Sequence, residues 1–153
     1  MITEVCAYLK NWFDREQPKI YSEFVIEDGN IFLANGEDMG IAVNQYYRII
    51  GSVFNDGVHK YGDATDVLED ERFVGAIWFM AVPKDVIALC ADIQAWQNKY
   101  GSADSVNMSP FTSESFGGYS YSKGSTSSDS KTISAVPTWE STFASRLARY
   151  KKL

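Results

Sequence analysis

The stretch YYRIIGSVFNDGVHKY, residues 46–61, is the most strand-like part of the chain and decides the fold of its first half. Aromatic and β-branched residues, which favour β-strands, dominate residues 46–54. Asn55, Asp56 and Gly57 then supply a turn, because an Asp-Gly pair adopts the positive φ angles of a tight hairpin. Alternation resumes at residues 58–61, so the stretch predicts a hairpin.

The segments on either side continue the β pattern. Residues 21–26 and 31–33 are strand-like and flank a turn at residues 27–30. The segment GAIWFMAV, residues 75–82, is long and apolar enough to form a buried strand. Together these segments predict a small antiparallel β-domain over residues 18–82.

Three helices are predicted outside this β region. An N-terminal helix covers residues 3–14 and ends before Pro18, and a central helix occupies most of 83–101, between a proline and a glycine. A C-terminal helix opens at Thr138 after Pro137. Its apolar stripe and the cations beside it are Trp139, Phe143, Leu147, Tyr150, Arg146 and Arg149.

A long Ser- and Gly-rich segment, residues 102–136, separates the last two helices. Its composition predicts a flexible arm, yet residues 119–122 alternate large and small side chains like a strand. We expect this part to order by adding an edge strand to another protein chain. The alternative is an ordinary hairpin that folds back on its own β-domain.

Composition places the chain among globular proteins. It has 153 residues, of which 45% are hydrophobic and 22% charged, enough for one domain with a core. The net charge of −6 disfavours a general nucleic-acid binder. Cys6 and Cys90 are predicted to be free, buried thiols. Neither a signal peptide nor a membrane span is evident, so we expect synthesis in a cytoplasm.

Catalytic and metal-binding motifs are absent from the sequence. It contains no phosphate-binding loop, no dinucleotide fingerprint and no His-Glu-x-x-His, and His59 is its only histidine. The acidic residues between Asp63 and Glu71 lack the spacing of a calcium loop, which indicates a solvated turn. The prediction is a protein that is not an enzyme and needs no cofactor or metal.

Three stretches occur in an order typical of one family: YYRIIGSVFNDGVHKY, then DERFVGAIWFMAVPKDVIAL, then SPFTSESFGGYSYSKG followed by WESTFASRLARYKKL. The sequence resembles the head-tail connector (adaptor, or head-completion) proteins of long-tailed bacteriophages and prophages, most closely over residues 83–153. The resemblance implies a virion protein, made in the host bacterial cytoplasm, that forms a ring of about twelve subunits by a repeated contact. Its implied partners are other copies of itself, the portal protein, and a neck stopper or tail protein. DNA would pass through the ring without sequence-specific binding, and no membrane is involved.

The resemblance and the patterns together predict an α+β fold. They indicate a helical connector core, made of the N-terminal, central and C-terminal helices, with the small antiparallel β-domain inserted in it. The expected parts are an N-terminal helix (1–17), the β-domain (18–82), a central helix (83–101), a flexible arm with a β-hairpin (102–136), and a C-terminal helix with a basic tail (137–153).

The residues expected at protein interfaces lie in the arm and the last helix. They are Ser113, Glu114, Ser115, Phe116, Gly117, Gly118, Tyr119, Tyr121, Trp139, Phe143, Arg146, Leu147, Arg149 and Tyr150. Two alternatives to the connector function are a neck stopper or tail-completion protein and a small ligand-binding β module.

Overall fold

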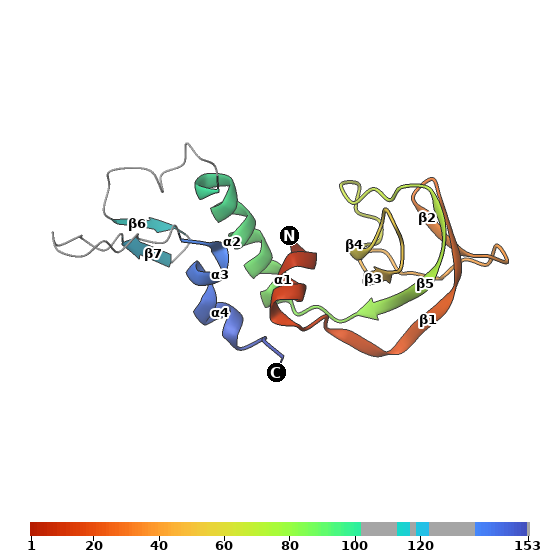
Figure 1. The fold of residues 1–153 in the computed structure, drawn as a ribbon, viewed down its shortest axis with the longest axis horizontal. Coiled ribbons are helices and arrows are strands. Elements are labelled where there is room, and N and C mark those ends of the chain that lie inside the picture. Colours follow the sequence, from red (N-terminus) through yellow and green to blue (C-terminus); the bar gives the residue numbers. More distant parts are fainter. Residues whose placement is uncertain (102–112, 117–118, 123–136, 153) are drawn as a thin grey trace. The chain divides into compact units, whose positions relative to one another are not determined.

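The structure, a computed structural model, describes residues 1–101, 113–116, 119–122 and 137–152. These residues form two compact units, Ile2–Pro83 and Lys84–Leu153, with Met1 grouped in the second. Each unit has its own elements (Figure 1).

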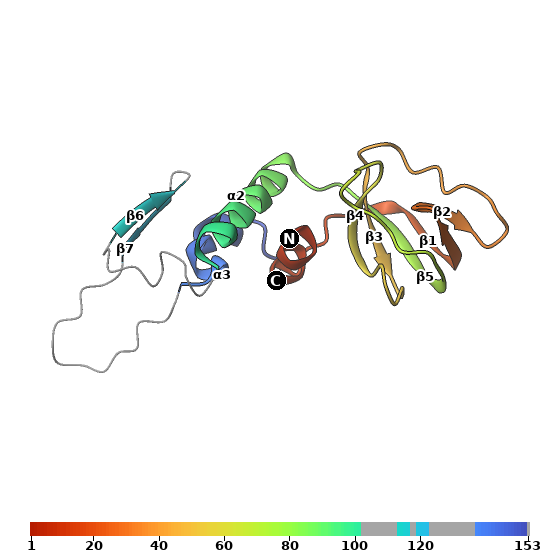
Figure 2. The same ribbon diagram turned by 90° about the horizontal axis from the view of Figure 1, so that it is seen from above.

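The first unit is built on a curled antiparallel sheet of five strands, a half-barrel. The strands lie in the order β2-β1-β5-β3-β4, with neighbours in that order antiparallel. The same strands are seen from above in Figure 2. The elements of the unit are α1 (Ile2–Leu9), β1 (Asp14–Glu27), β2 (Asn30–Leu33), β3 (Tyr46–Ile50), β4 (Gly57–Lys60) and β5 (Glu71–Met80).

The hydrophobic core of this unit comes from alternate positions of the strands. One face of β5 supplies Phe73, Ile77 and Phe79, which fits the side-chain period of two in a strand. Burial of such apolar area is the main force that closes the sheet. The other members of the cluster are Phe24, Ile26, Ile31, Met39, Ile41, Tyr47, Ile49 and Leu68.

The predicted helical core with a small inserted β-domain is wrong. The larger part of the described chain is the half-barrel, and its helix α1 is short. The N-terminal helix was expected to reach residue 14, but Lys10 and Phe13 have φ angles of 51° and 52°, which an α-helix does not contain. Pro18 was expected to follow a helix, but it lies inside β1. The pairing of β1 with β5 is irregular there, between Asp14 and Lys19, which accommodates a proline.

The second unit contains the central helix, α2 (Lys84–Tyr100), as the spacing of apolar residues predicted. Its buried positions recur every three or four residues, and the N–H of Gly101 donates to the carbonyl of Gln97 (2.7 Å) at its end. Both cysteines are free and buried, as expected, and burial raises the pKa of Cys90 to about 11. The buried residues of α2 are Val86, Leu89, Cys90, Ile93, Trp96 and Tyr100.

The C-terminal segment forms two short helices instead of the single helix that was predicted. They are α3 (Trp139–Thr142) and α4 (Ala144–Ala148). Thr138 and Ser141 form a reciprocal capping box at the start of α3. The break falls at Phe143, whose backbone (φ −101°, ψ 11°) departs from helical geometry.

The second unit also contains a two-stranded antiparallel sheet. Its strands are β6 (Ser113–Phe116) and β7 (Tyr119–Ser122). The register pairs Ser113 with Ser122 at one end and Phe116 with Tyr119 at the other. In the described part of the chain these two strands pair only with each other.

Candidate interaction surfaces

The loop 51–56, which joins β3 to β4, is held by the carboxylate of Glu71 at the start of β5. That carboxylate accepts hydrogen bonds from the N–H groups of Val53 (2.8 Å) and Phe54 (3.4 Å). It also accepts from the side-chain amide of Asn55 (3.2 Å) and from the hydroxyl of Ser52. Desolvation raises the pKa of Glu71, but these four bonds outweigh it and hold the pKa below its ordinary value.

Asn55 is the second anchor of this loop. Its side-chain amide donates to the carbonyl of Glu69 (3.0 Å), and its Oδ1 accepts from the N–H of Glu69 (2.8 Å). The N–H of Asn55 donates to the hydroxyl oxygen of Ser52 (2.6 Å). Asn55 is buried, so these partners replace the water that its amide would otherwise bind. The loop and residues 69–71 therefore form one bonded structure.

The tip of this loop is apolar and exposed. Val53 is 79% exposed and Phe54 is 69% exposed, although their backbone N–H groups are bound from beneath by Glu71. Glu69 and Asp70, on the bonded neighbouring segment, are also exposed. We call these four residues the apolar-acidic tip.

His59 on β4 ties the loop to the segment that follows β4. Its Nδ1 lies 2.8 Å from Oδ1 of Asp66, and its Nε2 lies 2.9 Å from the carbonyl oxygen of Asn55. Both neighbours are acceptors, so the imidazolium, which donates from both nitrogens, fits this position. Burial lowers the pKa of His59, but the bonds to Asp66 and Asn55 and the nearby negative charge raise it overall.

A pocket of about 420 Å³ lies beside this histidine, lined in part by Asp28, Tyr61, Asp63 and Asp66. Two of its acidic groups, Asp63 and Asp66, are already engaged within the chain. The Asp66 carboxylate accepts from the N–H of Lys60 (2.6 Å) as well as facing His59, and Asp63 accepts from the N–H of Thr65 (3.0 Å). These bonds stabilise the loop after β4 and leave the acids less available to a ligand.

Cations and aromatic rings alternate across the outer face of the sheet. The guanidinium carbon of Arg48 lies 3.5 Å from the ring centroid of Trp12 and 5.9 Å from that of Trp78. The ammonium nitrogen of Lys19 lies 4.4 Å from the Trp78 centroid. Both cations are within the range of cation–π attraction. We call Trp12, Lys19, Arg48 and Trp78 the cation–aromatic patch.

The interface residues that the sequence predicted fall in two different settings. Ser113, Glu114, Ser115 and Phe116 form β6, and Tyr119 and Tyr121 lie in β7. Gly117 and Gly118 lie outside the described residues. Of the three turn residues, Asn55 and Asp56 lie in the loop 51–56, whereas Gly57 begins β4.

The apolar stripe of the predicted C-terminal helix is partly buried within the second unit. Phe143 and Leu147 are 2% and 1% exposed, and the ring of Phe143 meets Trp96 of α2 edge-on at 6.5 Å. Trp139 and Tyr150 are half-buried. The neighbouring cations bind acids of α2: Arg146 lies 2.7 Å from Asp92, and Arg149 lies 3.6 Å from Asp85.

Sequence reasoning missed both the apolar-acidic tip and the cation–aromatic patch. The turn residues were noticed, but nothing local links them to Glu71, which is distant in sequence. Arg48 in an otherwise apolar strand was an available signal for the patch. Trp12 falls within the helix predicted over residues 3–14, whereas its contact with Arg48 depends on the turn at residues 10–13.

The described residues contain no group of three His, Cys, Asp or Glu side chains able to hold a metal ion. None of the helices in the described part of the chain has the length and apolar character needed to cross a bilayer. No family model, curated protein or solved structure matches the chain.

Proposed function

We propose that the protein is a non-catalytic structural subunit that assembles into a ring, as a head-tail connector of a long-tailed phage or prophage. The observation that carries the proposal is the β6–β7 sheet, whose two strands pair only with each other within the described residues. The partners proposed for the ring are further copies of the chain, the portal protein and a neck or tail protein.

A sheet of two strands is marginally stable in water by itself. Each of its strands has an outer edge of N–H and C=O groups that can pair with another chain. Addition of a strand from a neighbouring subunit would satisfy those groups and extend the sheet. A repeated contact of this kind between identical subunits closes a ring when the rotation allows it.

The order of elements in the second unit supports the connector form of the proposal. α2 is followed by the β6–β7 sheet and then by α3 and α4, and these elements cover the residues with the closest resemblance to the connector family. Burial of Phe143 and Leu147 makes the last helices part of the body of this unit. The hairpin, and not the C-terminal stripe, is therefore the proposed contact between subunits.

A matched pair of substitutions at Ser120, in β7, tests the proposal. Ser120→Pro removes a backbone N–H and fixes φ, whereas Ser120→Ala keeps the N–H. Negative-stain imaging of each variant mixed with portal rings should show connector rings for the wild type and Ser120→Ala only. Rings that form equally well with Ser120→Pro would contradict the hairpin contact. A wild-type chain that never forms rings or joins a portal would contradict the connector function itself.

A further inference from the structure

Three of the four residues of the cation–aromatic patch lie at directly paired positions of three neighbouring strands, and Trp12 precedes β1. Trp78 of β5 is paired with Lys19 of β1 on one side and with Arg48 of β3 on the other. Directly paired residues project from the same face of a sheet, so the two cations flank one indole ring. The close contact with Trp12 and the longer one with Trp78 hold the Arg48 guanidinium between the two indole rings.

The polar groups of this patch have unused bonding capacity. Nε of Arg48 and Nε1 of Trp78 are buried and have no hydrogen-bond partner in the described structure. Arg48 and Lys19 form no ion pair with any described residue, whereas Arg72 lies 2.7 Å from Glu23 on the same sheet. These two buried donors are out of reach of a second molecule, so a partner's acceptor would bind the remaining donors of Arg48 and the ammonium of Lys19.

Asp14 is the acid nearest to the patch in the strand register, since it pairs with Met80, two positions along β5 from Trp78. One oxygen of its carboxylate is also buried without a hydrogen-bond partner. Asp14 therefore supplies neither the ion pair nor the hydrogen bond that Arg48 lacks.

The chemistry of the patch selects a carboxylate. A planar guanidinium presents donors in a fork that matches the two oxygens of a carboxylate, and a lysine beside it adds positive charge. Lys19 and Arg48 already lie over the indole rings, so the patch is poorly suited to stacking nucleic-acid bases. The net charge of −6 also disfavours a nucleic acid.

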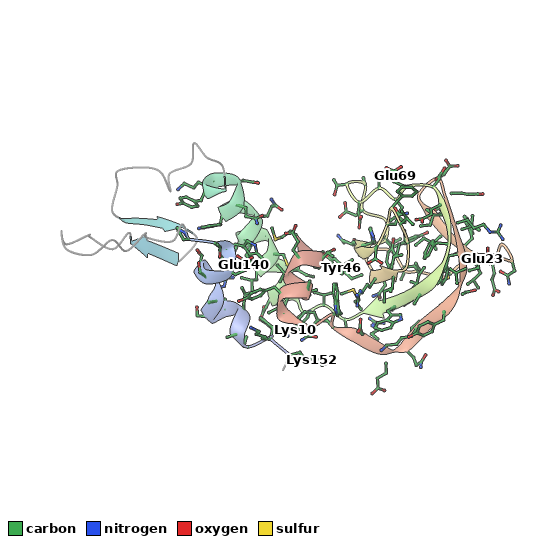
Figure 3. The ribbon with its side chains drawn as sticks, viewed as in Figure 1. Lys10, Glu23, Tyr46, Glu69, Glu140 and Lys152 are labelled. Carbon is green, nitrogen blue, oxygen red and sulfur yellow. The ribbon has the colours of Figure 1, made fainter. Side chains whose placement is uncertain are left out.

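The first unit carries matching carboxylates at a separate place. Glu69 and Asp70 are exposed beside the apolar Val53 and Phe54, although Oδ1 of Asp70 also accepts a hydrogen bond from the N–H of Asp28 (2.9 Å). Glu69 and Tyr46, the first residue of β3, lie well apart on this unit (Figure 3). Glu71 and Trp78 are seven positions apart on β5, a separation of about 23 Å at 3.3 Å per residue. One copy of the unit therefore does not bring the tip and the patch together.

We infer that the cation–aromatic patch of one subunit binds the apolar-acidic tip of a second copy, with Arg48 and Lys19 facing Glu69 and Asp70. This contact joins two different surfaces of the same chain, so it is heterologous and can repeat around a ring. It rests on the proposed ring assembly and adds a contact made by the first unit. Binding would also bury the exposed side chains of Val53 and Phe54, which stabilises the contact in addition to the charge attraction.

Charge exchange between the two surfaces tests this inference. Lys19→Glu and the double variant E69K/D70K should each weaken self-association of the full chain at least about tenfold in a sedimentation concentration series. An equimolar mixture of the two variants should recover association between unlike chains, because the unchanged tip of Lys19→Glu can bind the unchanged patch of E69K/D70K. Two variants at exposed positions are controls for total charge: Lys152→Glu for Lys19→Glu, and the double variant E16K/E27K for E69K/D70K. Arg48→Met keeps the apolar stem and should also weaken association with an unchanged thermal midpoint.

Four outcomes would overturn the inference. They are association of the variants equal to that of the wild type, an equal loss in the two controls, no recovery in the mixture, and a wild-type chain that stays monomeric throughout the series. Portal-bound rings, counted for the same proteins, separate this inference from the proposed function. Normal rings with Lys19→Glu reject only the contact described here, whereas absence of rings for the wild type rejects the connector.

Discussion

The loop 51–56 and the two-stranded β6–β7 sheet, here called the hairpin, are stabilised in opposite ways. Glu71 and His59 bind the loop, and its own Asn55 binds Glu69, so the apolar tip is fixed before any partner arrives. The hairpin strands, within the described residues, pair only with each other. A fixed surface saves the entropy of ordering at binding, whereas a free strand edge gains hydrogen bonds there.

This difference separates two kinds of assembly contact in one chain. Substitutions under the loop should change the stability of the isolated protein, because its bonds are already formed. Changes in the hairpin should leave that stability nearly unchanged and affect association instead.

Gly75→Ala should have the largest effect. A Cβ atom at this position would lie 2.1 Å from the carbonyl oxygen of Ile50, the residue before the loop. Relief of that overlap must separate β3 from β5, so we expect the free energy of unfolding to fall by about 3 kcal/mol. Urea denaturation measures it, with Ser22→Ala, on the strand paired with Gly75, as the control. Equal midpoints for the two variants would contradict the close approach.

Glu71→Gln should have an intermediate effect. The glutamine keeps the size of the side chain but loses the charge that strengthens the four hydrogen bonds. We expect a loss of about 1–2 kcal/mol, reduced by solvent screening. Hydrogen exchange at the N–H groups of Val53 and Phe54 should become faster. Glu69→Gln is the matched control, since its side chain is exposed, and equal exchange rates in both variants would refute the anchoring role of Glu71.

His59 should make the stability of the first unit depend on pH. Its pKa in the folded state is raised above 6.5, so its stabilising contribution is complete below that value and is lost as pH rises through the folded pKa. The facing groups are the carboxylates of Asp66 and Asp56, the carbonyl of Asn55, and the ring of Tyr47 at 5.7 Å.

Between about pH 6 and pH 8 we expect the free energy of unfolding to fall by about 1 kcal/mol or less. His59→Gln should remove this slope, which denaturation at each pH measures. The pKa of Asp66 shifts the other way. Burial raises it, but the bonds from His59 and Lys60 lower it overall, so its contribution is lost as pH falls through a value below 3.8. If the free energy of unfolding of His59→Gln depends on pH as that of the wild type does, His59 is not the source of the pH dependence.

The sequence predicted those parts of the fold that depend on local patterns. The pairing of β3 with β4 and the extent of α2 followed from alternation and from three- and four-residue spacing. The place of β5 between β1 and β3 did not, because register between distant strands has no local signal. Long-range packing also explains why the helix predicted over residues 3–14 was too long. The helix ends before Trp12 and Phe13, and after the turn at residues 10–13 these two side chains pack against Val58 and Met80 of the sheet.

The candidate sites also differ in whether the local sequence could predict them. The composition of residues 113–122 pointed to an interaction segment, since Ser- and Gly-rich chain has little use for Phe116 and Tyr119. The Glu71 anchor and the Arg48 stack join residues that meet only in three dimensions. The acids after β4 were expected to be solvated, yet Asp66 and Glu71 each accept several internal hydrogen bonds.

Hydrogen exchange of the hairpin amides, before and after ring assembly on the portal, tests whether the β6–β7 sheet is the contact between subunits. In the isolated chain the amides of residues 113–122 should exchange quickly, because a two-stranded sheet is marginally stable, while those of β5 are protected. In assembled rings the β6 and β7 amides should become protected, and the Ser120→Pro chain should show neither rings nor that protection at an unchanged thermal midpoint. Hairpin amides that exchange equally fast in the ring, or are already protected in the isolated chain, would contradict the claim.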